Sequence, residues 1–200
     1  MASRFIIGID EVGRGSLAGP VAVCVTLIPK GLKLRGIKNM PKLRDSKKMT
    51  EKNRKIWVNY ARSDGRITHK IVFAGEAAVD VFNVSKAANL AAEHALELLI
   101  RENGVLSADI FLDAGLLVRA PEGFSVRNIV RGDDKIPAIS LAAVLAKTAR
   151  DTYMRLLHFA YPNYGFWQNV GYGTKEHLTA LKLRGLSRVH RENFCRLYRT

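Results

Sequence analysis

The stretch GIDEVGRGSLAGP, residues 8–20, places two adjacent acids, Asp10 and Glu11, at the end of an apolar run. A glycine–arginine–glycine loop follows at residues 13–15. Glycine and aspartate are common in turns for backbone reasons alone, so a strand, a polar turn and a second strand would also give this pattern. The acids elsewhere in the chain are needed to choose between a turn and a functional site.

The net charge of the chain favours a polyanionic partner. Among 200 residues, 32 are lysine or arginine and 18 are acidic, which gives a net charge of +14. Such a surplus on a small chain is typical of proteins that bind nucleic acid. Part of the surplus lies in the basic segment 30–48, which has no clear periodicity. The alternative is that these basic side chains only solvate a surface.

Cysteine use and hydropathy predict a cytoplasmic protein without membrane contact. Cys24 and Cys195 form neither a metal-binding pattern nor a disulfide framework. No apolar stretch approaches the roughly 18 to 20 residues that a membrane span needs. The apolar run at the N-terminus is too short for a signal peptide and leads directly into acids.

Alternating apolar and amphipathic segments predict an α/β fold, a mixed sheet flanked by helices. We expect one domain over residues 1–200, in which residues from about 160 to 200 form a C-terminal helical segment. Short apolar, β-rich runs predict five strands, at 4–10, 20–28, 66–74, 107–113 and 124–130. Helical spacing predicts helices at 50–65, 83–104, 136–157 and 174–185.

Acids follow three of the predicted strands. Asp10 and Glu11 end the first, Asp113 ends the fourth, and Asp133 and Asp134 follow the fifth. In open α/β sheets, functional sites form where neighbouring strands end on the same side. Gathered carboxylates repel one another, and hard cations such as Mg²⁺ or Mn²⁺ resolve that repulsion. Two such ions roughly 3.5 to 4 Å apart can hydrolyse a phosphodiester, whereas scattered acids would only cap loops and helices.

Six parts of the sequence occur in a recognisable order: GIDEVGRGSLAGPVAV, DSKKMTEKNR, the strand-end Asp113, GDDKIPAISLAAVLAKTARD, YGFWQNVGYGT and HRENF. In this order they resemble type 2 ribonuclease H, the ribonuclease HII family. The resemblance implies a ribonuclease H fold, a five-stranded mixed sheet with helices and a C-terminal helical segment. It also implies a monomeric, metal-dependent endonuclease that cuts the RNA strand of RNA–DNA hybrids and cuts 5′ to single ribonucleotides in duplex DNA, leaving 3′-hydroxyl and 5′-phosphate ends. Its implied cellular role is the removal of ribonucleotides and RNA primers from DNA.

The resemblance also assigns roles to individual residues. It implies two Mg²⁺ or Mn²⁺ ions, present with bound substrate, and a loop that reads the 2′-hydroxyl by close backbone approach. A Cβ at residue 15 would obstruct that approach, and glycine also adopts turn conformations that other residues avoid. The implied metal-binding and catalytic residues are Asp10, Glu11, Asp113 and Asp133. The implied nucleic-acid contacts are Gly13, Arg14, Gly15, Ser46, Lys47 and Tyr172, with Tyr172 packed beside a deoxynucleotide sugar.

Several positions leave alternatives open. A lone tyrosine such as Tyr172 is also typical of a partly buried core residue. Asp151 has the helical spacing for an ion pair with Lys147, which we favour over metal ligation. Asp134 adds a carboxylate beside the fourth predicted ligand, and Asn169 with Val170 replaces a basic pair that is common in the family. The rival functions are a non-catalytic RNA–DNA binding module and a DNA-only nuclease or integrase-like phosphoryl transferase of the same fold.

Overall fold

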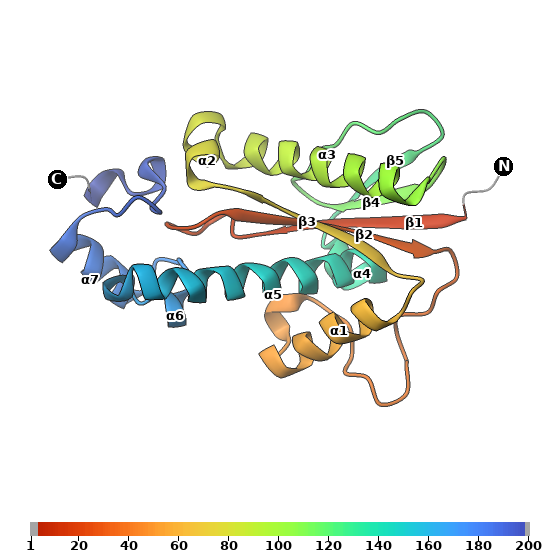
Figure 1. Cartoon of the computed structure of the whole chain (residues 1–200), viewed down its shortest axis with the longest axis horizontal. Helices are drawn as coiled ribbons and strands as arrows, with labels where there is room; N and C mark the ends of the chain where they lie inside the picture. The colour runs from red at the N-terminus through yellow and green to blue at the C-terminus, as the bar shows by residue number, and fades with distance from the viewer. Residues whose placement is uncertain (1–3, 199–200) are drawn as a thin grey trace.

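The computed structural model describes residues 4–198, and its centre is one mixed sheet of five strands in the order β3-β2-β1-β4-β5 (Figure 1). β1 pairs antiparallel with β2 and β2 with β3, whereas β1–β4 and β4–β5 are parallel pairs. The predicted α/β class and mixed sheet are therefore confirmed. The strands are β1 (Phe5–Val12), β2 (Val21–Pro29), β3 (Thr68–Ala74), β4 (Asp109–Asp113) and β5 (Ser125–Ile129).

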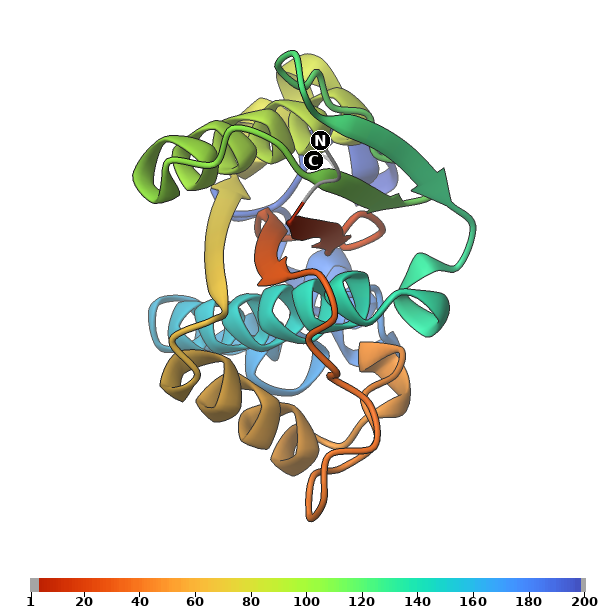
Figure 2. The same cartoon turned by 90° about the vertical axis from the view of Figure 1, so that its right-hand side faces the viewer.

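Helices cover both faces of the sheet. In Figures 1 and 2, α2 and α3 lie on one face, and α5 lies on the other with α1 outside it. The α-helices are α1 (Glu51–Ser63), α2 (Glu76–Phe82), α3 (Val84–Asn103), α4 (Gly132–Lys135), α5 (Pro137–Ala160), α6 (Phe166–Asn169) and α7 (Lys175–Arg184). Short 3₁₀ helices are η1 (Ser46–Lys48), η2 (Pro162–Tyr164), η3 (Glu192–Phe194) and η4 (Arg196–Tyr198).

Two predicted segments differ from the structure. Residues that precede the long helix α3 form the separate helix α2, which the sequence did not reveal because seven residues give too little periodicity. The segment with Asp133 and Asp134, predicted as a strand end, forms the single helical turn α4. In that turn Asp133 lines the pocket described below, whereas Asp134 pairs with Lys48.

A close backbone contact fixes the first turn of α5 on the sheet. A Cβ on Gly8 of β1 would lie 2.2 Å from the carbonyl carbon of Ala138, so only glycine allows this approach. The hydroxyl of Thr26 in β2 donates to the carbonyl of Ala138 at 2.9 Å. The helix that carries Lys147, Arg150 and Asp151 therefore has a fixed position relative to the strand that carries the first two acids.

The chain after α5 packs at the end of the sheet (Figure 1). It has its own buried cluster, to which Met154, Phe166, Leu181 and Cys195 contribute, and which includes Ala18 of the loop between β1 and β2. Residues 1–3 and 199–200, part of the predicted domain, lie outside the described residues. Among those described, no helix is both long and apolar enough to cross a membrane.

Candidate active site

All four predicted acids line one pocket of about 540 Å³. Parallel pairing places the carboxyl ends of β1 and β4 at the same edge, and β5 leads into α4 beside them. Six predicted nucleic-acid contacts line the same pocket: Gly13, Arg14, Gly15, Ser46, Lys47 and Tyr172. The structure therefore brings together all ten residues to which the resemblance assigns a catalytic, metal-binding or nucleic-acid-binding role.

The two acids of β1 are held differently. Asp10 is buried and its Oδ1 accepts from the amide of Glu11 at 2.7 Å. Burial, followed by the charges of Glu11 and Asp113, raises the pKa of Asp10 well above its usual range. Burial also raises the pKa of Glu11, although Arg14 Nη1 donates to its Oε1 at 3.3 Å. Arg14 therefore compensates only part of the repulsion between the carboxylates of Asp10 and Glu11.

The acids of β4 and α4 are linked through the backbone. Asp113 Oδ1 accepts from the amide of Gly132 at 2.7 Å, which ties the end of β4 to α4. Burial and then the charges of Asp45 and Asp113 raise the pKa of Asp133. The neighbouring Asp134 lies outside the pocket and accepts from Lys48 Nζ at 3.1 Å. The additional carboxylate in the sequence is thus part of a surface ion pair.

The pocket has the donor chemistry for a hard cation. Within residues 4–198, the side chains form no ready-made group of three or more His, Cys, Asp or Glu that could hold a metal ion. However, Glu11 Oε2 is buried and has no hydrogen-bond partner among the described residues. Leaving a buried carboxylate oxygen unpaired is unfavourable, and a divalent cation would pair it. Asp10, Glu11, Asp113 and Asp133 offer the oxygen-only set that Mg²⁺ or Mn²⁺ prefers.

The loop after β1 requires glycine at residue 13 for reasons within the protein. Gly13 has a φ of +100°, and a Cβ there would lie 2.1 Å from Nε of the buried Arg150. Gly15 does not have a positive φ, and a Cβ there would meet nothing within 4 Å. The expectation of a glycine-specific conformation at residue 15 is therefore wrong. The open space beside Gly15 faces the pocket, where substrate approach remains a prediction.

Two buried arginines that the sequence did not reveal support this loop from behind. Arg150 of α5 donates to the carbonyls of Pro20 at 2.8 Å and Val170 at 2.9 Å. Arg191, near the C-terminus, donates to the carbonyl of Arg14 at 2.9 Å. Both guanidinium groups are fully buried. Local patterns do not reveal these contacts, because Pro20 and Arg14 lie more than a hundred residues away along the chain from the arginines that bind them.

Tyr172 is half-buried in the pocket wall rather than in the core. Lys147 Nζ lies 5.7 Å and Arg150 Cζ 5.3 Å from the centre of its ring. The nearby Asn169 is buried, donates to the carbonyl of Tyr164 at 2.7 Å and accepts from the amide of Gly171 at 2.8 Å. The residue that replaces the family's usual basic pair therefore shapes the turn before Tyr172.

Lys147 and Asp45 also line the pocket and were missed as site residues. The helical spacing of Lys147 from Asp151 was a signal for Lys147, and the predicted ion pair between them is present at 2.7 Å. Asp45 begins the DSK motif, and its Oδ1 accepts from the amide of Lys47 at 2.9 Å. It therefore holds the η1 turn that carries Ser46 and Lys47.

Comparisons with known proteins were made over the whole chain. The family model described as Ribonuclease HII matches residues 7–197. A ribonuclease HII of Oceanobacillus iheyensis is 37% identical over 98% of this chain and 70% of its own length. That of Nitrosospira multiformis is 41% identical over 95% of this chain and 89% of its own length.

Solved structures share the fold. Ribonuclease H2 from Pyrococcus horikoshii matches with a TM-score of 0.69 and 19% identity, over 97% of this chain and 96% of that one. Bst-RNase HIII in complex with Mn²⁺ matches with a TM-score of 0.66 and 17% identity, over 96% of this chain and 65% of that one. With the pocket, the family model and the curated relatives in agreement, the chain belongs to the ribonuclease HII family and is a ribonuclease H, an enzyme that acts on RNA–DNA hybrids.

Proposed function

We propose that this ribonuclease H cuts the RNA strand of hybrids and also cuts 5′ to single ribonucleotides embedded in duplex DNA, leaving 3′-hydroxyl and 5′-phosphate ends. The observation that carries the proposal is that one pocket joins four carboxylates to the 13–15 loop and Tyr172. The carboxylates serve the hydrolysis, and the loop and the tyrosine serve recognition of the sugar. A nuclease that acts on DNA alone would have no use for a reader of the 2′-hydroxyl.

Asp10, Glu11, Asp113 and Asp133 would hold two Mg²⁺ or Mn²⁺ ions, and the Mn²⁺ complex of Bst-RNase HIII supports this choice of metal. When bound, the ions would supply an activated water and charge stabilisation at the leaving oxygen. The chain itself contributes the fixed positions of its acids. Gly132 orients Asp113 through its amide, and Arg14 holds one oxygen of Glu11 while leaving Oε2 unpaired.

The same pocket accounts for substrate binding. Ser46 and Lys47 on η1 line the pocket with the acids and are candidate phosphate contacts, and Gly15, where a Cβ would meet nothing within 4 Å, is the candidate contact for a sugar. The non-catalytic alternative is disfavoured because all four acids are present and mutually close enough to raise the pKa of Asp10. We further propose a monomer that works in the cytoplasm without membrane contact, in the removal of ribonucleotides and RNA primers from DNA. Its two cysteines, both buried and free, support a reducing compartment.

The test uses three duplexes that differ in one feature each: all-DNA, DNA with a single ribonucleotide, and an RNA–DNA hybrid. The wild-type enzyme should cut the second and third when Mg²⁺ or Mn²⁺ is present and leave the first intact. Asp10→Asn, Glu11→Gln and Asp113→Asn should each lose nearly all cleavage while circular dichroism stays unchanged. Cleavage of the all-DNA duplex at a similar rate would refute recognition of the 2′-hydroxyl.

Tyr172→Ala separates junction recognition from catalysis, because it leaves the carboxylates untouched. We expect a larger loss of rate on the single-ribonucleotide duplex than on the long hybrid, where no RNA–DNA junction has to be found. The measured quantity is the ratio of the two cleavage rates in variant and wild type. An unchanged ratio would mean that Tyr172 only fills the pocket wall.

A further inference from the structure

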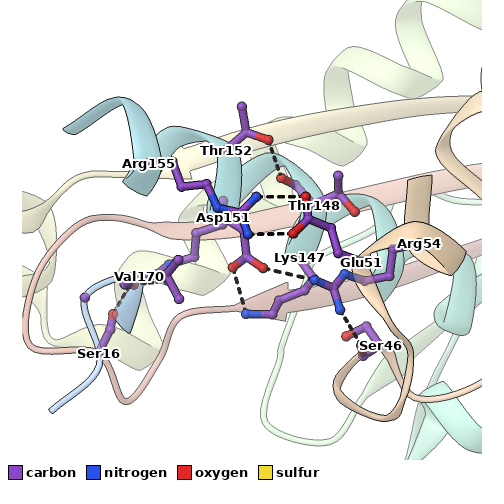
Figure 3. Close-up of polar contacts among 12 residues, drawn as sticks. Ser16, Ser46, Glu51, Arg54, Lys147, Thr148, Asp151, Thr152, Arg155 and Val170 are labelled. Carbon is purple, nitrogen blue, oxygen red and sulfur yellow. Dashed lines mark hydrogen bonds and ion pairs between the residues drawn. The ribbon is translucent and has the colours of Figure 1, made fainter. Parts of the chain in front are cut away.

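One buried carboxylate, that of Asp151, has two cationic partners, Lys147 and Arg54 (Figure 3). Asp151 of α5 is 5% exposed. Its Oδ1 accepts from Lys147 Nζ at 2.7 Å, and its Oδ2 accepts from Arg54 Nη2 at 3.3 Å. Two cations facing one carboxylate leave a positive charge that this cluster does not neutralise.

The Arg54 side of the cluster holds a turn of the pocket. Arg54 is itself buried, and its Nη1 donates to the carbonyls of Ser46 at 3.3 Å and Met49 at 2.7 Å. These carbonyls flank η1, whose Ser46 and Lys47 line the pocket. Asp151 therefore orients, through one guanidinium, the backbone that presents these two side chains.

The Lys147 side reaches the pocket directly. Lys147 lines the pocket beside Tyr172, and its side chain is 15% exposed. An ammonium has three N–H donors, and in the described part of the chain Asp151 is the one acceptor recorded for this group. Since the carboxylate holds the ammonium from behind, the remaining donors are available to a ligand in the pocket.

We propose that Lys147 binds a backbone phosphate of the nucleic acid, and that Asp151 is a positioning residue that holds Lys147 and the η1 turn in register. The inference deepens the proposed function, since it assigns a phosphate contact within the same pocket. A charged hydrogen bond to phosphate supplies affinity without sequence preference, which suits an enzyme that selects a sugar and not a base. An ion pair that served only to brace the helix would need neither a second cation nor access to the pocket.

The first experiment measures binding to an RNA–DNA hybrid without divalent metal, as a function of salt. The slope of log K against log salt is negative, and each lost phosphate contact reduces its magnitude by about 0.9 for B-form DNA. Lys147→Met should lower the slope by about this amount, and Lys147→Arg should restore it. The matched control is Arg101→Met, an exposed cation in the last turn of α3. Asn103 of that turn accepts from the hydroxyl of Thr68 at the start of β3. β3 is an edge strand of the sheet, whereas the acids lie on β1, β4 and α4.

The second experiment is a double-mutant cycle on kcat/KM with the hybrid substrate. In the wild-type background, Asp151→Asn should lower kcat/KM roughly tenfold, mainly by raising KM. In the Lys147→Met background, it should lower kcat/KM by less than about threefold, because a positioning residue acts through its partner. A merely structural Asp151 would lower Tm and cost the same in both backgrounds. An unchanged salt slope in Lys147→Met, or an additive cycle, overturns the proposal.

The binding arm stands even if Asp151→Asn does not fold, because Lys147→Met and its control decide the phosphate contact alone. Both arms use a hybrid, the substrate class of the family, so they do not depend on cleavage at single ribonucleotides. Failure of the wild type on the single-ribonucleotide duplex would therefore remove the proposed function and leave the Lys147 result interpretable.

Discussion

Two buried histidines connect the C-terminal segment to Tyr172, and their hydrogen bonds define one protonation pattern. The amide of Ser187 donates to His190 Nδ1 at 2.9 Å, so the proton of that ring is on Nε2. His190 Nε2 lies 3.0 Å from His177 Nε2, which must therefore accept. His177 Nδ1 then carries a proton and donates to the carbonyl of Tyr172 at 2.9 Å. The chain of bonds requires both rings to be neutral.

Acid should break this pair. Burial, and then the charge of His177, lowers the pKa of His190 from 6.5 to about 4. Between these values the unfolded chain binds a proton that the folded protein does not, so stability is fully present above pH 6.5 and is lost as the pH falls toward 4. The difference between the two pKa values corresponds to about 3 kcal/mol of free energy of unfolding.

The assay is urea unfolding of wild type and His190→Gln at several pH values from 7 to 4. Glutamine can donate to His177 but does not titrate in this range. The free energy of unfolding should fall by about 3 kcal/mol more in the wild type than in the variant, because other titrating groups cancel in the difference. His94→Gln, at an exposed position on α3, serves as the control. Parallel profiles for wild type and His190→Gln would refute the reasoning.

Three further predictions concern the pocket. Gly13→Ala should lower the free energy of unfolding by about 2 kcal/mol or more in urea titrations, because a Cβ at this positive φ meets a buried arginine. Gly15→Ala should keep wild-type stability and lose cleavage. Equal losses of stability in the two variants would contradict this prediction. Asp133→Asn should abolish cleavage while Asp134→Asn, outside the pocket, keeps it within about twofold, as measured by initial rates; the reverse order would reassign the fourth ligand. Lys47→Ala should lower the salt slope of hybrid binding by about one, and an unchanged slope would make Lys47 a bystander.

Local signals explain why most of the fold could be predicted from the sequence. Thr50 caps α1 by accepting from the amide of Asn53, and Gly104 ends α3 in the left-handed conformation. The strand ends of Asp10 and Asp113 meet because β1 and β4 are parallel, as the alternation of strands and helices indicated. The site was predictable to the extent that it follows from strand ends and a recognisable motif.

The remainder depends on contacts between distant residues. Arg150, Arg191 and Asp151 are charged side chains that a sequence reader places at the surface, yet all three are buried. Arg150 and Arg191 donate to backbone carbonyls of the loop between β1 and β2, and Asp151 pairs with Arg54 of α1, so these contacts form only when distant segments pack together. Asp133 and Asp134 are adjacent in sequence, and only the turn of α4 decides which of them faces the pocket.

The hydrogen bonds of the 13–15 loop indicate what it can offer to a ligand. The carbonyl of Gly13 accepts from the hydroxyl of Ser16 at 2.8 Å, and the carbonyl of Arg14 accepts from Arg191 at 2.9 Å. By contrast, no acceptor among residues 4–198 is recorded for the amides of Arg14 and Gly15. Because the carbonyls of Gly13 and Arg14 are satisfied by the protein, we expect the loop to contact a ligand through these two amides, which could donate to the oxygens of a hydroxyl or a phosphate. Since the distant Arg191 occupies the carbonyl of Arg14, we expect it to favour ligand binding through the amides of the loop.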